Sequence, residues 1–289
     1  MTAQPLGPVL QSFFVDHLIT LRGLRPTSVR SYRDVIRLLL VFVARARGCR
    51  LTRLTVEDLT FERILDFVRY LEEVRGNHVR TRNQRVTVLR TLFEYLASRM
   101  PEMLATCQRV AAIPGKRVAP PETHFLERDE ISALFSRLPA SGRRALRDRT
   151  LLLFFYNTGA RVQEVADLCV DHLELSSHSR VHLHGKGDKW RSCPLWEDTA
   201  RLLHSLLEQE HTSAVPKAPV FSSYGGRPLT RFGIYKIVRR HAALLDADQS
   251  KRRRWRVGPH ILRHTTAVHL LEAGVEANVI RGWLGHADL

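Results

Sequence analysis

The sequence predicts a mainly α-helical protein with a small β-hairpin, divided into two domains. Three observations lead to this fold class. Apolar residues recur at helical spacing through the first 112 residues. The alternation typical of strands, interrupted by a Gly-rich turn, is confined to residues 180–195. A segment with three prolines and a glycine, residues 112–121, separates the two parts.

Residues 1–112 are predicted to form helices alone. Pro26 suits the first turn of a helix, and the apolar residues after it lie three and four positions apart. Thr55 and Asp58 have the spacing of a capping box, which predicts that the next helix follows directly. The expected helices are 26–43, 59–71 and 81–96.

Polar stripes on two of these helices are candidate DNA contacts. Each stripe has its members three or four residues apart, away from the apolar positions. A solvated helix face is the alternative for each stripe, but two stripes on a strongly basic chain favour contact with a polyanion. The residues are Arg30, Arg33 and Arg37 on the first helix, and Asn83, Thr87 and Arg90 on the other.

Residues 113–124 are predicted to be an extended linker, because the prolines there cannot continue a helix. A long loop inside one domain is the alternative. Residues 125–289 form the second domain, which mixes helices with one hairpin. Its expected helices are 127–138, 147–156, 199–210, 230–245 and one after Pro259, and its expected strands are 180–184 and 189–195.

The charge is strongly unbalanced, since 45 Lys and Arg residues face 29 Asp and Glu residues and the net charge is +16. Such an excess predicts a polyanionic partner, nucleic acid first and an anionic membrane surface second. Residues 1–112 carry 18 arginines, no lysine and 10 acidic residues, which leaves +8 on each part of the chain. Both domains are therefore expected to meet the polyanion, as a clamp does.

The densest basic cluster is a run of four residues followed by a tryptophan. It is either a solvated loop or a loop that binds phosphates. We include it among the candidate DNA contacts, as Lys251, Arg252, Arg253 and Arg254.

Composition excludes several other classes of protein. A hydrophobic content of 44% rules out wholesale disorder. No apolar run approaches the roughly 20 residues of a membrane span, and the N-terminus lacks the pattern of a secretory signal. The four cysteines are far apart, which predicts reduced thiols in a cytoplasm rather than a disulfide framework or a zinc knuckle.

Two motifs place one cation close to glycine. Arg161 follows Gly159, where an apolar helix stops, and starts another helix on which Glu164 lies one turn on and can brace it. Lys186 stands between two glycines at the hairpin tip, where it can project towards a ligand. Each motif by itself is equally typical of an ordinary helix end or a solvated turn.

Two further motifs contain histidines. Pro259 starts a helix on which His260 and Arg263 share a face near the N-terminus, a place that favours anions. His260 and His264 have the spacing of a zinc pair, but the glutamate of HExxH is missing, so structural imidazoles are favoured over a metal site. His286 follows a glycine that ends a helix.

Together these motifs supply two arginines, a lysine and two histidines. The set suits phosphoryl transfer without a metal ion, because two guanidiniums neutralise the charge on non-bridging oxygens in place of magnesium. A lysine can protonate the leaving oxygen, and imidazoles can donate hydrogen bonds or move protons. No cofactor is expected, and the set still lacks a nucleophile.

In order and wording, these motifs resemble the tyrosine recombinases, also called the phage integrase family. The resemblance covers about residues 9–289 and is sharpest in the second domain. It implies a C-shaped clamp of a helical core-binding domain and a catalytic domain round double-stranded DNA, which cuts and rejoins strands through a 3′-phosphotyrosine. The matching strings are Thr158-Gly-Ala-Arg-Val-Gln-Glu164, Gly185-Lys-Gly-Asp-Lys189, His260-Ile-Leu-Arg-His264 and Leu284-Gly-His-Ala-Asp-Leu289.

The resemblance also implies a role for each motif residue. Arg161 and Arg263 match the two arginines that clamp the scissile phosphate. Lys186 matches the general acid that protonates the departing 5′ oxygen. The others are His260, which acts on the nucleophile's proton or on a phosphate oxygen, His286, which donates a hydrogen bond to the phosphate, and Glu164, the supporting acid.

The family's nucleophilic tyrosine lies shortly after the Leu-Gly-His motif, whereas this sequence stops three residues past His286. Its six tyrosines, at 32, 70, 95, 156, 224 and 235, all precede that motif. We expect a recombinase or integrase of a mobile element or plasmid that lacks its nucleophile segment as given. The alternatives are a catalytically silent DNA-binding protein on the same fold and a tyrosine supplied by another subunit.

The resemblance further implies a bacterial, cytoplasmic and nucleoid-associated protein that forms a dimer on one site and a tetramer in synapsis. The family segment beyond the tyrosine links the protomers, so assembly is expected once that segment is present. No membrane partner is expected. A zinc-dependent hydrolase that uses His260, His264 and a third ligand is a remote alternative.

Overall fold

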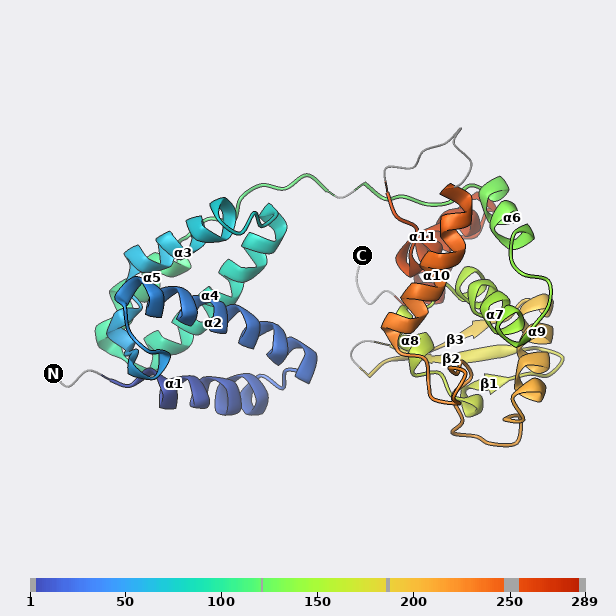
Figure 1. Cartoon of the computed structure of the whole chain (residues 1–289), viewed down its shortest axis with the longest axis horizontal. Helices are drawn as coiled ribbons and strands as arrows, with labels where there is room; N and C mark the ends of the chain where they lie inside the picture. Colours follow the sequence, from blue (N-terminus) through green and yellow to red (C-terminus); the bar gives the residue numbers. More distant parts are fainter. Residues whose placement is uncertain (1–3, 121, 186–187, 247–254, 286–289) are drawn as a thin grey trace. The chain divides into compact units, whose positions relative to one another are not determined.

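In a computed structural model, the chain forms two compact units, Met1–Pro121 and Glu122–Leu289. The structure describes residues 4–120, 122–185, 188–246 and 255–285. Helices dominate both units, and the three strands of the described chain form one sheet in the second unit (Figure 1). The predicted fold class, mainly α-helical with a small sheet in the second part, is confirmed.

The first unit consists of helices. Its elements are α1 (Leu6–Ser12), the π-helix η1 (Phe13–Leu21), α2 (Pro26–Arg47), the 3₁₀ turns η2 (Leu51–Arg53) and η3 (Val56–Asp58), α3 (Phe61–Glu73), α4 (Val79–Arg99), the 3₁₀ turn η4 (Pro101–Met103) and α5 (Leu104–Ala111). α4 packs against α2, α3 and α5 and buries Leu89, Leu92 and Phe93 completely. It is therefore the central helix of this unit.

α2 begins where the sequence predicts. Pro26 occupies its first turn, where the missing N–H has no helical partner to lose. Ile36 and Leu39 on its apolar side are buried. The helix ends at Gly48, whose φ of 65° lies in the left-handed region that favours glycine at a helix end.

The helix predicted to follow Thr55 and Asp58 directly begins later. These two residues do form a capping box, but it closes the single turn η3. Asp58 is buried, and its carboxylate also binds Arg47 and Arg63. It therefore ties this turn to its neighbours instead of opening a helix. α3 begins after Thr60, whose hydroxyl accepts a hydrogen bond from the Arg63 N–H at 3.3 Å.

The second unit combines helices with a small sheet. Its elements are α6 (Arg128–Ser136), α7 (Arg143–Thr158), α8 (Val162–Ala166), the 3₁₀ turn η5 (Val170–His172), β1 (Leu173–Glu174), β2 (Arg180–His184), β3 (Trp190–Pro194), α9 (Glu197–Gln209), α10 (Arg231–Asp246), α11 (Pro259–Glu272) and α12 (Ala277–Leu284). The sheet is antiparallel in the order β1-β2-β3, and His184 pairs with Trp190 at the end of the hairpin. The predicted hairpin is observed, whereas β1 is a strand that the sequence pattern did not indicate.

α7 is the central helix of the second unit. It packs against α9 and α11, and it buries Phe154 and Phe155 completely. α12 packs against α11 and β3, and α8 packs against β2 and α10. Hydrogen bonds hold the end of α7, the start of α8, strand β3 and the end of α12 together.

The described residues between Pro114 and Glu127 form neither helix nor strand. The boundary between the two units follows Pro121, inside this segment. No helix in the described part of the chain is long and apolar enough to cross a membrane. All four cysteines are unpaired thiols.

Candidate active site

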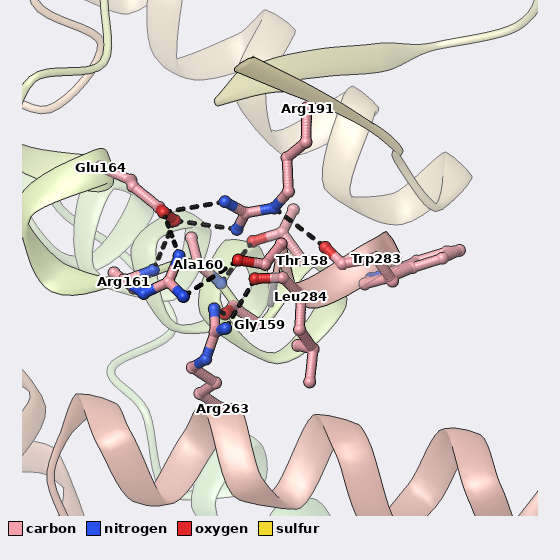
Figure 2. Close-up of polar contacts among 10 residues, drawn as sticks. Thr158, Gly159, Ala160, Arg161, Glu164, Arg191, Arg263, Trp283 and Leu284 are labelled. Atoms are coloured by element: carbon pink, nitrogen blue, oxygen red, sulfur yellow. Dashed lines mark hydrogen bonds and ion pairs between the residues drawn. The ribbon is translucent and has the colours of Figure 1, made fainter. Parts of the chain in front are cut away.

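The two arginines that the motifs single out lie together in the second unit. Arg161 is the N-cap of α8, two residues after Gly159, and Arg263 lies on the first turns of α11. Because α11 packs along α7, both side chains reach the turn between α7 and α8 (Figure 2). Two segments about a hundred residues apart in the sequence therefore supply two neighbouring cations.

Glu164 on α8 binds two arginines at once. Its carboxylate accepts hydrogen bonds from the Arg161 backbone N–H (2.7 Å) and Nη1 (2.9 Å), and from Nη1 and Nη2 of Arg191 on β3 (2.8 Å each). The side chain is only 2% exposed. Burial alone would raise the pKa of Glu164, but the hydrogen bonds and charges of Arg191 and Arg161 outweigh burial and hold the pKa below its ordinary value. Glu164 is therefore a carboxylate at neutral pH.

The C-terminal end of α12 is capped by three arginines. The last carbonyls of a helix have no partner within the helix and need donors from elsewhere. The hydrogen bonds are Arg191 Nε to Trp283 O (2.9 Å), Arg263 Nη2 to Leu284 O (2.6 Å) and Arg161 Nη2 to Gly285 O (3.1 Å). Three consecutive carbonyls are thus held by the arginines of the candidate site (Figure 2).

Arg263 is almost fully buried, with 6% of its surface exposed. Its Nη1 donates a second hydrogen bond, to the carbonyl of Gly159 at the end of α7 (2.6 Å). Burial, followed by the charges of Arg161 and Arg191, lowers the pKa of Arg263 to about 10. The side chain therefore remains a cation at neutral pH and joins the ends of two helices.

The site has more positive than negative charge. Within the described residues, the guanidiniums of Arg161, Arg191 and Arg263 meet the single carboxylate of Glu164, and the α12 carbonyls add only the partial negative charge of a helix end. The Arg161 side chain is 32% exposed, so the excess charge reaches solvent there. Guanidinium forks bind the oxygens of phosphate well, so an anionic phosphodiester suits this site.

The two histidines of the third motif lie on α11 beside Arg263. His260, on the first turn, lines a pocket of about 440 Å³ together with Val162 and Tyr235. Burial, and then the nearby His260 and Arg263, lower the pKa of His264. Among the described residues, no three His, Cys, Asp or Glu side chains lie close enough to hold a metal ion.

Several predicted residues lie outside the described part of the chain: Lys186, His286, Lys251, Arg252, Arg253 and Arg254. Gly185, which precedes Lys186, and Gly285, which precedes His286, are described. A Cβ on Gly185 would lie 3.3 Å from Glu164 Oε1 and 3.8 Å from Arg161 Nη1. The carbonyl of Gly285 accepts a hydrogen bond from Arg161. Both glycines therefore lie next to Arg161.

Arg191 is a site residue that the sequence motifs did not single out. A signal for it exists in the predicted strand, where Arg191, Cys193 and Leu195 alternate onto one face. Both apolar neighbours are buried, and an arginine on such a face needs a partner for its charge. That partner, Glu164, lies 27 residues earlier in the chain, a pairing that the strand pattern cannot supply.

Two of the candidate DNA contacts on α4 bind the chain segment that follows α5. Asn83 exchanges two hydrogen bonds with the backbone of Lys116, at 2.7 and 3.1 Å. Arg90 donates to the carbonyl of Ile113. These bonds hold the start of the segment between the units against α4. The third candidate on this helix, Thr87, is exposed.

The basic stripe of α2 lies at the surface of the first unit. All three of its arginines, Arg30, Arg33 and Arg37, are exposed. Beside it, α2 and α4 enclose a pocket of about 430 Å³ whose lining is mostly polar and includes Thr27, Ser31, Gln84 and Thr87. Thr87, of the polar stripe on α4, therefore lines the same pocket as Thr27 at the start of α2.

Comparison with known proteins identifies the family. The phage integrase family matches residues 124–289, and the phage integrase N-terminal SAM-like domain matches residues 12–100. The chain belongs to the phage integrase family. This integrase-family protein therefore has family segments in both of its compact units.

Relatives of this integrase-family protein match most of its length. The putative integrase/recombinase y4rD of Sinorhizobium fredii is 37% identical over 90% of this chain and 92% of its own. The tyrosine recombinase XerC of Pelobacter propionicus is 29% identical over 99% of this chain and 89% of its own.

Two solved structures share the fold. XerH recombinase in a post-cleavage complex with a palindromic difH substrate has a TM-score of 0.73 and 20% identity, and the match covers 92% of this chain and 75% of that one. The Tn1549 transposon integrase in complex with a circular intermediate DNA has a TM-score of 0.69 and 14% identity, and the match covers 99% and 93%.

Replacing Gly159 by alanine is expected to destabilise the second unit by about 2–4 kcal/mol. The φ of Gly159 is 57°, in the left-handed region, and an added Cβ would lie 2.4 Å from Leu284 Cδ2. The change thus combines backbone strain with a clash against α12. Urea unfolding followed by tryptophan fluorescence measures the loss in this unit alone, because all four tryptophans belong to it: Trp190, Trp196, Trp255 and Trp283.

Gly274→Ala is the matched control. Its φ is 82°, but an added Cβ would meet nothing within 4 Å. It should lose only the backbone contribution, about 1–2 kcal/mol. Equal losses in the two variants would contradict close packing of α12 on the α7–α8 turn.

Proposed function

We propose that this protein is a site-specific DNA recombinase that cuts and rejoins DNA strands through a 3′-phosphotyrosine. The observation that carries the proposal is the convergence of Arg161 and Arg263, with excess positive charge, on one turn of the second unit. Family membership supports it, as do the names of the relatives, which are recombinases and integrases.

In the proposed reaction, Arg161 and Arg263 hold the non-bridging oxygens of the scissile phosphate. Their charges stabilise the transition state in the way that magnesium does in other phosphoryl transfers, so neither a metal ion nor ATP is required. Glu164 supports Arg161. The tyrosine oxygen forms a bond to phosphorus, and the bond from phosphorus to the 5′ oxygen breaks.

The remaining roles concern protons. Lys186 gives a proton to the departing 5′ oxygen, His260 handles the proton of the nucleophile, and His286 donates a hydrogen bond to the phosphate. A free 5′-hydroxyl then attacks the phosphotyrosine, which releases the tyrosine and rejoins a strand. The bond energy is kept throughout, so ligation needs no high-energy cofactor.

Double-stranded DNA is the proposed partner, met by both units. The candidate contacts in the first unit are Arg30, Arg33, Arg37, Asn83, Thr87 and Arg90, and those in the second are Lys251, Arg252, Arg253 and Arg254. Backbone phosphates supply most of the affinity of such basic surfaces. In the proposal, once the family's C-terminal segment is present, a dimer occupies one site and two dimers form a synaptic tetramer in the bacterial cytoplasm, on the nucleoid. The Tn1549 integrase, whose name is that of a transposon enzyme, supports a mobile-element setting.

The proposal assigns no nucleophile among the six tyrosines of this sequence. In the family the nucleophile follows the Leu-Gly-His motif, and none of these six tyrosines follows it. Tyr156 donates to or accepts from His269 Nδ1 (2.8 Å), and burial raises its pKa, which makes it a poor phenolate. Tyr224 and Tyr235 are exposed but precede the HxxR motif. The second candidate function is a catalytically silent DNA-binding protein on the same fold.

The test begins with a duplex that the 289-residue chain selects from a random pool. We expect a complex that Arg161→Ala weakens, because one clamp contact is lost, and no covalent adduct from this chain alone on a nicked suicide version of the duplex. Binding is measured by fluorescence anisotropy, and adducts are detected by denaturing electrophoresis.

Three outcomes are informative. Binding without any sequence preference would contradict a site-specific recombinase. An adduct formed by the 289 residues alone would show that one of the six tyrosines of this sequence is the nucleophile. If a version extended by the coding sequence after Leu289 forms an adduct that Arg161→Ala abolishes, the recombinase is supported over the silent protein.

A further inference from the structure

Arg191 has no role in the proposed reaction, yet three of its donor groups are used inside the site. Its Nη1 and Nη2 bind the two oxygens of Glu164, and its Nε binds the carbonyl of Trp283. The side chain is only 9% exposed. Burial of a charged side chain is unfavourable unless hydrogen bonds compensate it. The three hydrogen bonds of Arg191 supply this compensation.

We infer that Arg191 is a positioning residue of the phosphate clamp: it holds Glu164, and through Glu164 Arg161, in register with the end of α12. The inference rests on the proposed function. In this inference Arg191 does not contact the phosphate itself but positions Arg161, which does.

Arg161 and Arg191 share the carboxylate of Glu164. Glu164 Oε1 accepts from the Nη1 atoms of Arg161 and Arg191, and Oε2 accepts from the Arg161 backbone and Arg191 Nη2. Arg191 contributes half of these bonds and the only ones from outside the α8 cap. Without Arg191, the side chain of Glu164 can change its rotamer on α8. The guanidinium of Arg161, which is bound to Glu164, then moves with it.

Arg191 also connects this carboxylate to the end of α12. Arg191 Nε binds the Trp283 carbonyl, while a Cβ on Gly285 would lie 2.8 Å from Arg191 Cδ. The aliphatic part of the Arg191 side chain therefore packs against Gly285, the residue before His286. The φ of Gly285 is 65°, in the left-handed region that favours glycine. One side chain fixes both the support of Arg161 and the point from which the next motif leaves α12.

Among the cationic side chains, only arginine can make all three of these bonds. A guanidinium offers a planar pair of donors for the carboxylate and keeps Nε for a separate acceptor. A lysine is a single point charge and cannot make the two parallel bonds and the third one together. Arg191→Lys should therefore preserve the charge of the site but not the position of Arg161.

The experiment compares duplexes in which one phosphate at a time is a neutral methylphosphonate. The phosphate that Arg161 clamps is identified by two results. Its neutralisation lowers the affinity of the wild type for the duplex, and it does not lower the affinity of Arg161→Ala any further. A charge-assisted contact predicts a loss of roughly 10-fold or more for the wild type at that position. Arg191→Met and Arg191→Lys are expected to reduce this loss to less than about 2-fold.

The double variant is the sharper readout, because an arginine with a purely structural role would weaken all duplexes alike. Arg161→Ala combined with Arg191→Met should behave as Arg161→Ala does at the clamped phosphate. Arg180→Met on β2 is the control: this arginine also pairs with a glutamate, Glu174 (3.3 Å), but its side chain is 49% exposed and its ion pair does not involve Glu164. It should keep the wild-type loss.

The outcomes separate the two levels of the proposal. A folded Arg191→Met or Arg191→Lys that keeps the wild-type discrimination would overturn the positioning role, and Arg191→Lys serves if the methionine variant does not fold. If the wild type discriminates at no phosphate, the proposed function fails and the inference with it. If the wild type and Arg161→Ala behave as expected, only the role of Arg191 is at stake.

Discussion

Replacing Arg263 by alanine is expected to lower the free energy of unfolding of the second unit by about 3–5 kcal/mol. Arg263 is almost fully buried and donates to the carbonyls of Gly159 and Leu284 at 2.6 Å each. Alanine would leave two buried carbonyls without donors and a space between α7 and α12. Urea unfolding followed by tryptophan fluorescence measures the change.

Arg281→Ala is the control for this prediction. Arg281 lies on α12, the helix whose end Arg263 caps from α11, but Arg281 is exposed, so its loss should stay within about 0.5 kcal/mol. Arg263→Lys should fall between the two, because a lysine keeps the charge and can reach one carbonyl. A loss of less than about 1 kcal/mol for Arg263→Ala would show that these carbonyls do not depend on Arg263.

Replacing Glu164 by glutamine is expected to destabilise the second unit by about 3–5 kcal/mol at pH 7. The carboxylate is the counter-charge of Arg161 and Arg191 and lies near Arg263. A neutral amide of the same shape would leave three neighbouring cations and place an NH₂ group against a guanidinium donor. The measurement is urea unfolding of both proteins across a pH series.

The pH dependence of this difference has a definite sign. The pKa of Glu164 in the folded protein lies below its ordinary value of 4.5. Its stabilisation is therefore complete above about pH 4.5 and is lost as pH falls through the folded pKa. The difference between wild type and Glu164→Gln should shrink in acid. Glu174→Gln, at an exposed ion pair, should differ from wild type by no more than about 1 kcal/mol throughout.

Both predictions describe a clamp that belongs to the fold. Arg263 and Glu164 hold helix ends together, so changing them alters stability as well as charge. Arg161 is the more exposed member, and its variants are better suited to measure phosphate binding by itself. Loss of binding in an Arg263 variant needs an unfolding measurement beside it before it is attributed to the phosphate.

Local features of the fold were predictable where a short stretch decides them. The strand β2 has the predicted bounds, and Pro26 begins α2 as expected. The capping box of Thr55 and Asp58 was recognised but assigned to the wrong element, because Asp58 is buried among Arg47 and Arg63 and closes a single turn. Its partners come from two other helices, Arg47 on α2 and Arg63 on α3, and the spacing of the capping box does not indicate these pairings.

The sequence predicted most residues of the candidate site but not the hydrogen bonds that join them. Gly159 and Pro259 mark the helix boundaries that flank Arg161 and Arg263, which is why the motifs were visible. Arg191 was missed, because nothing near it in the sequence indicates a buried carboxylate. The capping of α12 by three arginines was equally invisible, since it joins β3, α8 and α11 to one helix end.

The sequence by itself determined a basic, mainly helical protein whose motifs supply cations for a phosphate. These properties depend on composition and on spacing within a few turns. Tertiary structure alone decided that Glu164 also binds Arg191, that Arg263 bridges α7 and α12, and that the end of α12 is held by cations. The physical reason is that buried charges are stable only with partners, and packing brings those partners from distant parts of the chain.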